Sequence, residues 1–359
     1  MVGANPIKIA FLLCVLQAVA AQAQTAPLWV TNQGAAFPDK DWLSVVETGK
    51  DRASAQTAAM NALARVFKTD VQSMTRAYEE FAQTVSESGD KKIAAFSESQ
   101  DFAQEVKTSS NVTGLVGVQT EVWTAADGMV YANARMNRKD CAARYTAMIR
   151  ENEQVIQLLK QTAAENPATF EAFESLSFAA NVAAVTDNFQ SLLEVLDVSA
   201  AGRRPEYGNA DTVRTLAQAE ARSIAIIIQV EGDVSNRMSR AFSSFFTKRD
   251  FRAAASGDSA YVLYAILELE NADVGNQRIK YVRYLLMATL EDRNGKEVFS
   301  FSVNDRQGQA TESAARQRAL QAAEAAINSG SFAAAFDAYL ASLLFQSTRS
   351  HETRQRFIE

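Results

Sequence analysis

The sequence predicts an α+β protein in which two small β-α-β-β-β-α domains are separated by a long helical hairpin. Three observations indicate this fold. Apolar residues recur at helical spacing in some segments and alternate with polar residues in others. The same order of predicted elements occurs twice along the chain. One run that is dense in turn formers, Gly202 to Gly208, separates the two occurrences.

The first domain is predicted to span residues 24–140. Trp42 to Thr48 has the composition of a short strand, and Ser54 is expected to be the N-cap of the helix that follows, whose small and apolar residues repeat every three or four positions. Residues 98–113 predict a more polar strand. Residues 117–136 predict a hairpin, because they contain an Asp-Gly turn signal between two alternating segments. The helix is therefore expected to pack on a sheet.

Residues 141–201 predict the helical hairpin. The apolar period becomes helical from Lys139, and Asn166-Pro167 supplies an expected cap followed by proline at the first helical position. A second helix is expected to run to about Val198. Each helix carries an apolar stripe, so we expect the two to pack on each other as a spacer or platform between the domains.

The second domain is predicted to span residues 210–346, after a linker at 202–209 that has almost no apolar residues to bury. Residues 347–359 are expected to form a polar tail. The expected elements are a buried strand (223–230), a helix (238–245), three further strands (261–270, 280–290 and 298–303) and two Ala-rich helices (311–327 and 331–346).

Residues 1–23 predict a secretory signal peptide, with Lys8 in the basic region, an apolar core, and Ala21-Gln22-Ala23 as the cleavage site. The apolar core is shorter than the ~20 residues that cross a bilayer. We therefore expect an exported, soluble chain in the periplasm or outer envelope, with no transmembrane segment after cleavage. A lipid anchor at Cys14 is the alternative, and it is less favoured because Cys14 lies inside the apolar core.

Composition excludes several classes of function. Loss of Lys8 with the signal leaves 35 basic against 42 acidic residues, an acidic balance that makes nucleic acid a poor partner. Only Cys141 would remain after cleavage, so no intramolecular disulfide is available. The single histidine, His351, excludes Ser-His-Asp and Cys-His hydrolase arrangements and His-rich zinc sites. We expect no cofactor and no enzymatic activity.

The strongest candidates for chemistry are carboxylates. Glu268, Glu270 and Asp273 could act as acid and base or bind a cation, but they are better explained as the solvent face of an alternating strand. We therefore predict no catalytic, cofactor-binding or metal-ligating residue. Four other groups are likewise better explained by a structural role than by a functional one: Glu231 with Asp233, Gly49 to Arg52, the aromatic set Trp29, Trp42, Trp123 and Tyr131, and the basic set Arg278, Lys280, Arg283 and Arg293. Cys141 is expected to be a packing residue.

Residues 27–140 resemble the LPP20 family of bacterial envelope proteins. The matching positions are Pro27-Leu28-Trp29, Phe37-Pro38-Asp39, Gly49, Asp51-Arg52, Ala55, Ala59, Leu63, Ala64 and Phe67. Residues 220–346 are faintly similar to the middle domain of flagellar assembly protein T, which is of the TolB N-domain type. The resemblance implies an envelope setting and transfers no catalytic residue.

The leading hypothesis from these patterns is a non-enzymatic exported protein that acts through contacts with other envelope proteins, in flagellar, secretion or envelope-complex assembly. The alternative is a peptidoglycan- or ligand-binding module, for which the basic and aromatic segment Lys280 to Tyr284 would be the binding surface. An enzyme that uses carboxylates alone is a third, weaker hypothesis.

Overall fold

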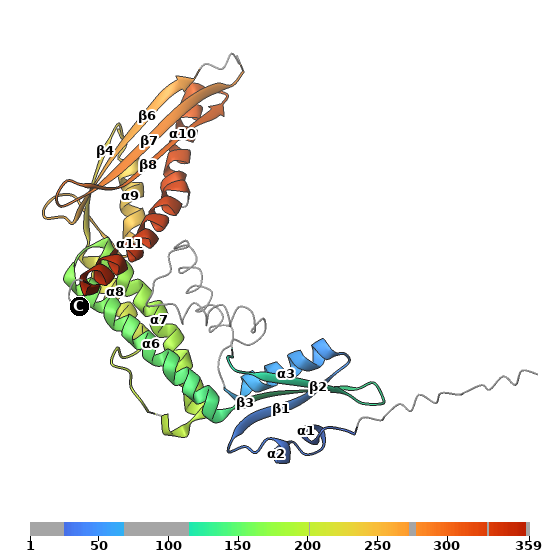
Figure 1. The fold of residues 1–359 in the computed structure, drawn as a ribbon. Helices are drawn as coiled ribbons and strands as arrows, with labels where there is room; N and C mark the ends of the chain where they lie inside the picture. The colour runs from blue at the N-terminus through green and yellow to red at the C-terminus, as the bar shows by residue number, and fades with distance from the viewer. Residues whose placement is uncertain (1–24, 68–114, 201, 273–277, 329, 357–359) are drawn as a thin grey trace, which may run out of the picture.

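The chain combines α-helices with two β-sheets in the computed structural model, as the sequence predicts (Figure 1). The structure describes residues 25–67, 115–200, 202–272, 278–328 and 330–356, with side chains described through Leu343 of the last range. Outside the described residues lie the expected signal peptide, Cys14, the expected strand at 98–113 and Asp273.

The N-terminal sheet is antiparallel and has the order β1-β3-β2. Its strands are β1 (Trp42–Gly49), β2 (Gln119–Thr124) and β3 (Val130–Asn137), so the predicted strand and hairpin are confirmed. Helix α3 (Arg52–Val66) covers one face of the sheet (Figure 1). The buried residues of α3 are mostly alanines, and they pack with small sheet residues such as Ala132 and Ala134. Small side chains on both sides let the helix and the sheet approach closely.

The predicted N-cap of α3 is wrong by three residues. Asp51 is the N-cap, and Ser54 is the third helical residue. The Asp51 carboxylate accepts a hydrogen bond from the Ser54 N–H at 2.7 Å, and the Ser54 hydroxyl accepts one from the Asp51 N–H at 3.1 Å. This reciprocal pair is a capping box, which satisfies two backbone donors at once.

The other face of the N-terminal sheet is covered by the segment that contains α1 (Leu28–Thr31) and α2 (Gln33–Ala36). The Gln33 side chain donates to the Ser44 carbonyl at 2.6 Å, and the Arg135 guanidinium lies 4.6 Å from the centre of the Phe37 ring. Beneath them, fully buried Asn133 donates to the Ser44 hydroxyl at 2.7 Å. This segment therefore covers the second face of the sheet around Ser44, Asn133 and Arg135.

The helical hairpin is present as predicted. Helix α6 (Arg138–Glu165) starts directly where β3 ends, and α7 (Phe170–Leu196) packs along it. The predicted cap at Asn166-Pro167 is wrong, because the N-cap of α7 is Thr169, whose hydroxyl accepts from the Ala172 N–H at 3.1 Å. Pro167 lies in the connection between the two helices. The next residue, Ala168, has a positive φ of 60°, which is not a right-handed helical conformation, so α7 begins only after it.

Helix α8 (Ala210–Ser223) was not predicted, and it packs on α7 as a third member of the helical layer. The linker before it buries more than expected: Tyr207 is 5% exposed and donates to the Asp187 carboxylate at 2.8 Å. The other oxygen of the same carboxylate accepts from the Ala210 N–H, also at 2.8 Å. The boundaries at 141–201, 202–209 and 210–346 stay a prediction.

The C-terminal sheet has the order β5-β4-β6-β7-β8. Its strands are β4 (Ala225–Glu231), β5 (Arg252–Ala254), β6 (Tyr261–Ala272), β7 (Lys280–Asp292) and β8 (Glu297–Gln309). Strand β4 runs parallel to β5 and β6, and the remaining neighbours are antiparallel. Short β5 was not predicted, and β8 extends six residues beyond its predicted end at Val303.

Helices α9 (Arg237–Thr247), α10 (Glu312–Asn328) and α11 (Ser331–Arg356) pack against the C-terminal sheet (Figure 1). Part of the expected polar tail, residues 347–356, is helical and continues α11. The core is aromatic, and Phe170 from α7 enters it by stacking 4.2 Å from Tyr261. Helix α7 thus contributes to both cores. Among the described residues, no helix combines the length and apolarity that crossing a membrane requires.

Candidate functional site

One face of the C-terminal sheet carries apolar side chains that pack in neither hydrophobic core of the described structure. Leu263, Ala265 and Leu267 are buried toward the helices. Because side chains alternate along a strand, Tyr264 and Ile266 point to the opposite face. Tyr264 is 42% exposed, and the apolar residues around it are half-buried. We call this patch the open sheet face: Val262, Tyr264, Ile266, Leu285 and Met287.

Polar and charged residues surround the open sheet face on neighbouring strands. Ile266 pairs with Glu231 on β4 and with Met287 on β7. Met287 pairs in turn with exposed Ser302 on β8. Farther along, exposed Glu270 pairs with exposed Arg283. An apolar centre with a polar rim is the anatomy of a protein interface.

The carboxylate candidates do not form a site in the described residues. Glu268 and Glu270 are exposed on one face of β6, as the alternation predicts, where they contribute to the rim of the open sheet face. Asp233 is buried, and its two oxygens accept from the backbone N–H groups of Arg237 and Ser239 at 2.8 and 2.9 Å. Asp233 therefore stabilises the start of α9.

The aromatic candidates form separate pairs. Trp42 packs on Phe37 with ring centres 5.4 Å apart, and Trp123 packs on Tyr131 at 5.6 Å. Strand register places Trp42 and Tyr131 at opposite ends of the N-terminal sheet, so the four residues do not make one platform. Trp29 is 4% exposed, as expected of a core residue.

Cys141 is buried against the N-terminal sheet, where its thiol donates weakly to the Gly117 carbonyl at 3.8 Å. Burial raises the pKa of this thiol, which disfavours the reactive thiolate. The expected packing role fits this environment. In the part of the chain that the structure describes, no three His, Cys, Asp or Glu side chains are grouped as a metal site would require.

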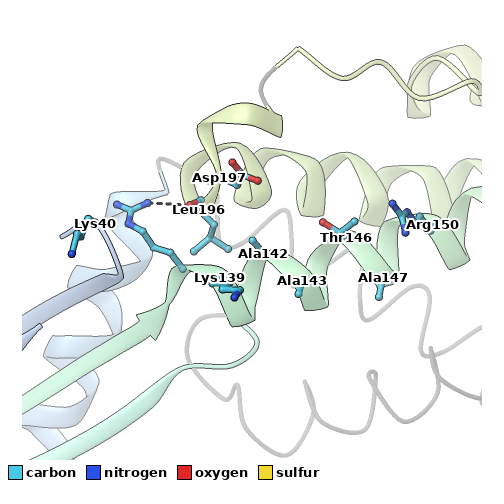
Figure 2. A pocket seen from close by; sticks show the side chains of 10 residues that line it. Lys40, Lys139, Ala142, Ala143, Thr146, Ala147, Arg150, Leu196 and Asp197 are labelled. Atoms are coloured by element: carbon cyan, nitrogen blue, oxygen red, sulfur yellow. Dashed lines mark hydrogen bonds between the residues drawn. The ribbon is translucent and has the colours of Figure 1, made fainter. Parts of the chain in front are cut away.

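A second feature, which the sequence analysis missed, is a cavity of about 600 Å³ where the start of α6 meets the end of α7 (Figure 2). We call it the basic groove. Its lining consists of Lys40, Arg138, Lys139, Ala142, Ala143, Thr146, Ala147, Arg150, Leu196 and Asp197. The sequence pattern did not indicate it, since folding brings Lys40 to α6 from a segment about a hundred residues earlier.

Arg138 builds one wall of the basic groove. One nitrogen of its guanidinium donates to the Val195 carbonyl at 2.7 Å and to the Leu196 carbonyl at 3.3 Å, and Nε donates to the Asp39 carbonyl at 2.8 Å. The last carbonyls of a helix lack partners within it, and the end of the helix carries partial negative charge. Arg138 therefore stabilises the end of α7 and fixes a positive charge in the wall.

Comparison with known proteins identifies no family. No family model and no curated protein matches the chain. Among solved structures, it is similar to a secreted protein of Helicobacter pylori at 12% identity, over 85% of this chain and 97% of that one, with a TM-score of 0.38. A putative lipoprotein of Caulobacter crescentus matches at 17% identity over 36% and 95%, with a TM-score of 0.24. Such low scores leave location and function to be argued from this chain's own residues.

Proposed function

We propose that this protein is a non-enzymatic exported protein of the bacterial envelope that binds a partner protein through the open sheet face. The observation that carries the proposal is the apolar centre on β6 and β7, where half-buried residues surround exposed Tyr264 inside a polar rim. Apolar surface gains roughly 25 cal/mol per Å² when it leaves water, and clustered exposed apolar residues mark interaction sites.

The helical layer behind the sheet supports this role because it makes the surface rigid. Phe332 meets Phe242, Phe245 and Phe299 edge-on at ring-centre distances of 5.0 to 5.7 Å. Tightly packed aromatic rings restrict movement of the strands in front of them. A preorganised surface loses less conformational entropy on binding, so more of the contact energy appears as affinity.

The proposed setting rests on the N-terminal residues. The signal peptide predicted at 1–23 directs export, and the LPP20 resemblance of residues 27–140 favours the periplasm or outer envelope. Within that setting, the faint similarity of residues 220–346 to flagellar assembly protein T favours a role in assembling a flagellar, secretion or other envelope complex. The partner is then another envelope protein.

A second candidate function, binding of peptidoglycan or another envelope ligand, is favoured by one corner of the same sheet. The Arg306 guanidinium lies 5.7 Å from the centre of the Tyr281 ring, and Arg306 pairs across the strands with exposed Arg283. Aromatic and basic groups thus meet in the segment Lys280 to Tyr284, where cation–π contact orders the arginine.

The proposed function predicts that Ile266→Thr with Met287→Thr reproduces the phenotype of a gene deletion while the protein keeps its circular dichroism spectrum. Threonine retains strand propensity and removes apolar surface. The matched control is Leu216→Gln with Val234→Thr, which removes exposed apolar surface elsewhere. Full complementation by the sheet variant would contradict the proposal, and equal loss in the control would show that the effect is not specific.

A further inference from the structure

We propose that the basic groove binds an extended acidic segment of a partner protein. This site is separate from the open sheet face and does not depend on the proposed function of that face. Three properties of the groove point to such a ligand: its charge, its length and the chemistry of its lining (Figure 2).

The groove is strongly positive on a chain that is negative overall. Four cationic side chains line it against one carboxylate, Asp197, whereas the whole chain has a net charge of −6. Asp197 accepts from both the N–H and the hydroxyl of Ser199, at 2.9 and 2.6 Å, which orders the carboxylate but leaves its charge, so four cations face one anion. A local field of the opposite sign is the arrangement that steers an anionic partner to one place.

The cations of the groove are available to a ligand. Lys40 is 3.9 Å from the Asp41 carboxylate, and both side chains are largely exposed, a pairing that is weak in water. Lys139 and Arg150 are exposed on α6. Arg138 is held by carbonyls, which do not cancel its charge. Carboxylates that replace water around these groups would form charge-assisted hydrogen bonds.

The length of the groove fits an extended chain. Lys139 and Arg150 lie on one face of α6, eleven residues apart, which corresponds to roughly 16 Å along a helix. The residues between them on that face are small: Ala142, Ala143, Thr146 and Ala147. An extended peptide rises about 3.3 Å per residue, so about five residues connect the two cations. The expected ligand therefore carries acidic side chains about five residues apart.

The lining favours a peptide over other anions. The groove is widely open to solvent, whereas sites for small molecules enclose most of their ligand. Its lining residues include no aromatic side chain on which a sugar ring or a nucleobase could stack. The alanine floor and the Leu196 side chain instead offer apolar contact to the backbone and methylenes of a peptide.

The test measures fluorescence anisotropy of a labelled peptide with paired glutamates at both ends of a five-residue spacing, titrated with the purified protein. We expect salt-sensitive binding that Lys139→Gln with Arg150→Gln weakens about tenfold or more, because two charge-assisted contacts are lost. Arg316→Gln with Arg318→Gln, on exposed positions of α10, removes the same charge as a control and should leave affinity within about twofold.

Three results would overturn the inference. Equal weakening by both double variants would mean that only net charge matters. Equal binding of a peptide with glutamines in place of the glutamates would exclude recognition of acidic groups. Binding of an anionic peptidoglycan fragment, with no binding of the peptide, would assign the groove to a glycan. Circular dichroism of each variant, with Arg150→Glu alone as a second variant, guards against misfolding.

Discussion

The two sheets of this protein differ in what covers their second faces. The N-terminal sheet has α3 on one face and the segment of α1 and α2 on the other, where Asn133 and Arg135 occupy a network of polar contacts. Among the described residues, the C-terminal sheet has an aromatic helical layer on one face and no helix on the other. On its second face, residues such as Ile266 and Met287 remain partly exposed.

The second faces of the two sheets differ in whether they contribute to packing within the chain. In the N-terminal region, the second face of the sheet packs on the segment of α1 and α2 and buries the polar side chain of Asn133. In the C-terminal region, the helical layer already stabilises the sheet, so the second face adds apolar surface without adding to the core. Surface of that kind is the usual sign of an interaction site.

The largest expected effect is a loss of stability when a residue of the aromatic layer is changed, compared with a change on the open sheet face. Phe336→Ala should lower the free energy of unfolding by about 3 to 5 kcal/mol, because Phe336 is fully buried and contacts several other rings. Urea denaturation measures this. Tyr264→Ala on the opposite face should cost far less. A similar cost for both would mean that the open sheet face is part of the folding core.

A smaller effect concerns the contact of α7 with the C-terminal region. Burial, and then the nearby Asp337 carboxylate, raise the pKa of Glu174 from 4.5 to about 7. The folded state therefore favours the protonated form of Glu174. Its contribution to the free energy of unfolding is fully present below pH 4.5 and is lost as the pH rises through about 7, because the buried side chain must then ionise. Glu174→Gln should stabilise the protein by about 1 to 2 kcal/mol at pH 8 and hardly at pH 4.

Denaturation midpoints of the wild type and Glu174→Gln across this range check the prediction. Asp337 also accepts two hydrogen bonds from Arg249, at 3.0 and 3.1 Å, so Asp337→Asn is a less clean change and serves only as a comparison. A parallel pH profile for the wild type and the glutamine variant would show that Glu174 ionises normally.

The smallest expected effect concerns the carboxylates at the rim. Glu268→Gln, Glu270→Gln and Asp273→Asn together should leave the cellular role intact, because Glu268 and Glu270 are exposed rim residues, and exposed charges at a rim contribute little to affinity. Genetic complementation measures it. A variant that folds normally but reproduces the deletion phenotype would revive an acid–base or cation site.

Local chemistry explains which elements the sequence predicted. Turns such as Asp292 to Lys296 are specified within a few residues, since the Asp292 carboxylate accepts from the N–H groups of Asn294 and Lys296. Helix α8 was missed because its buried stripe consists largely of alanines such as Ala217 and Ala221. A small side chain gives little hydrophobic signal, although it packs well against another helix.

The candidate sites were harder to predict because they depend on contacts between distant segments. The basic groove exists only when Lys40 meets the start of α6. The open sheet face did have a signal: Tyr284 to Ala288 is apolar at five successive positions, which indicates that both faces of β7 exclude water. The helices cover one of these faces, and we propose that a partner protein covers the other.

The most direct measurement of the central claim is photo-crosslinking in the living cell, with benzoylphenylalanine placed at Tyr264 or, as a control of similar exposure, at Leu216 on α8. We expect one dominant protein adduct from position 264 that is absent from position 216 and that disappears when Ile266→Thr and Met287→Thr are added. Identical products from both positions, or no adduct at 264 from a protein that complements the deletion, would contradict it.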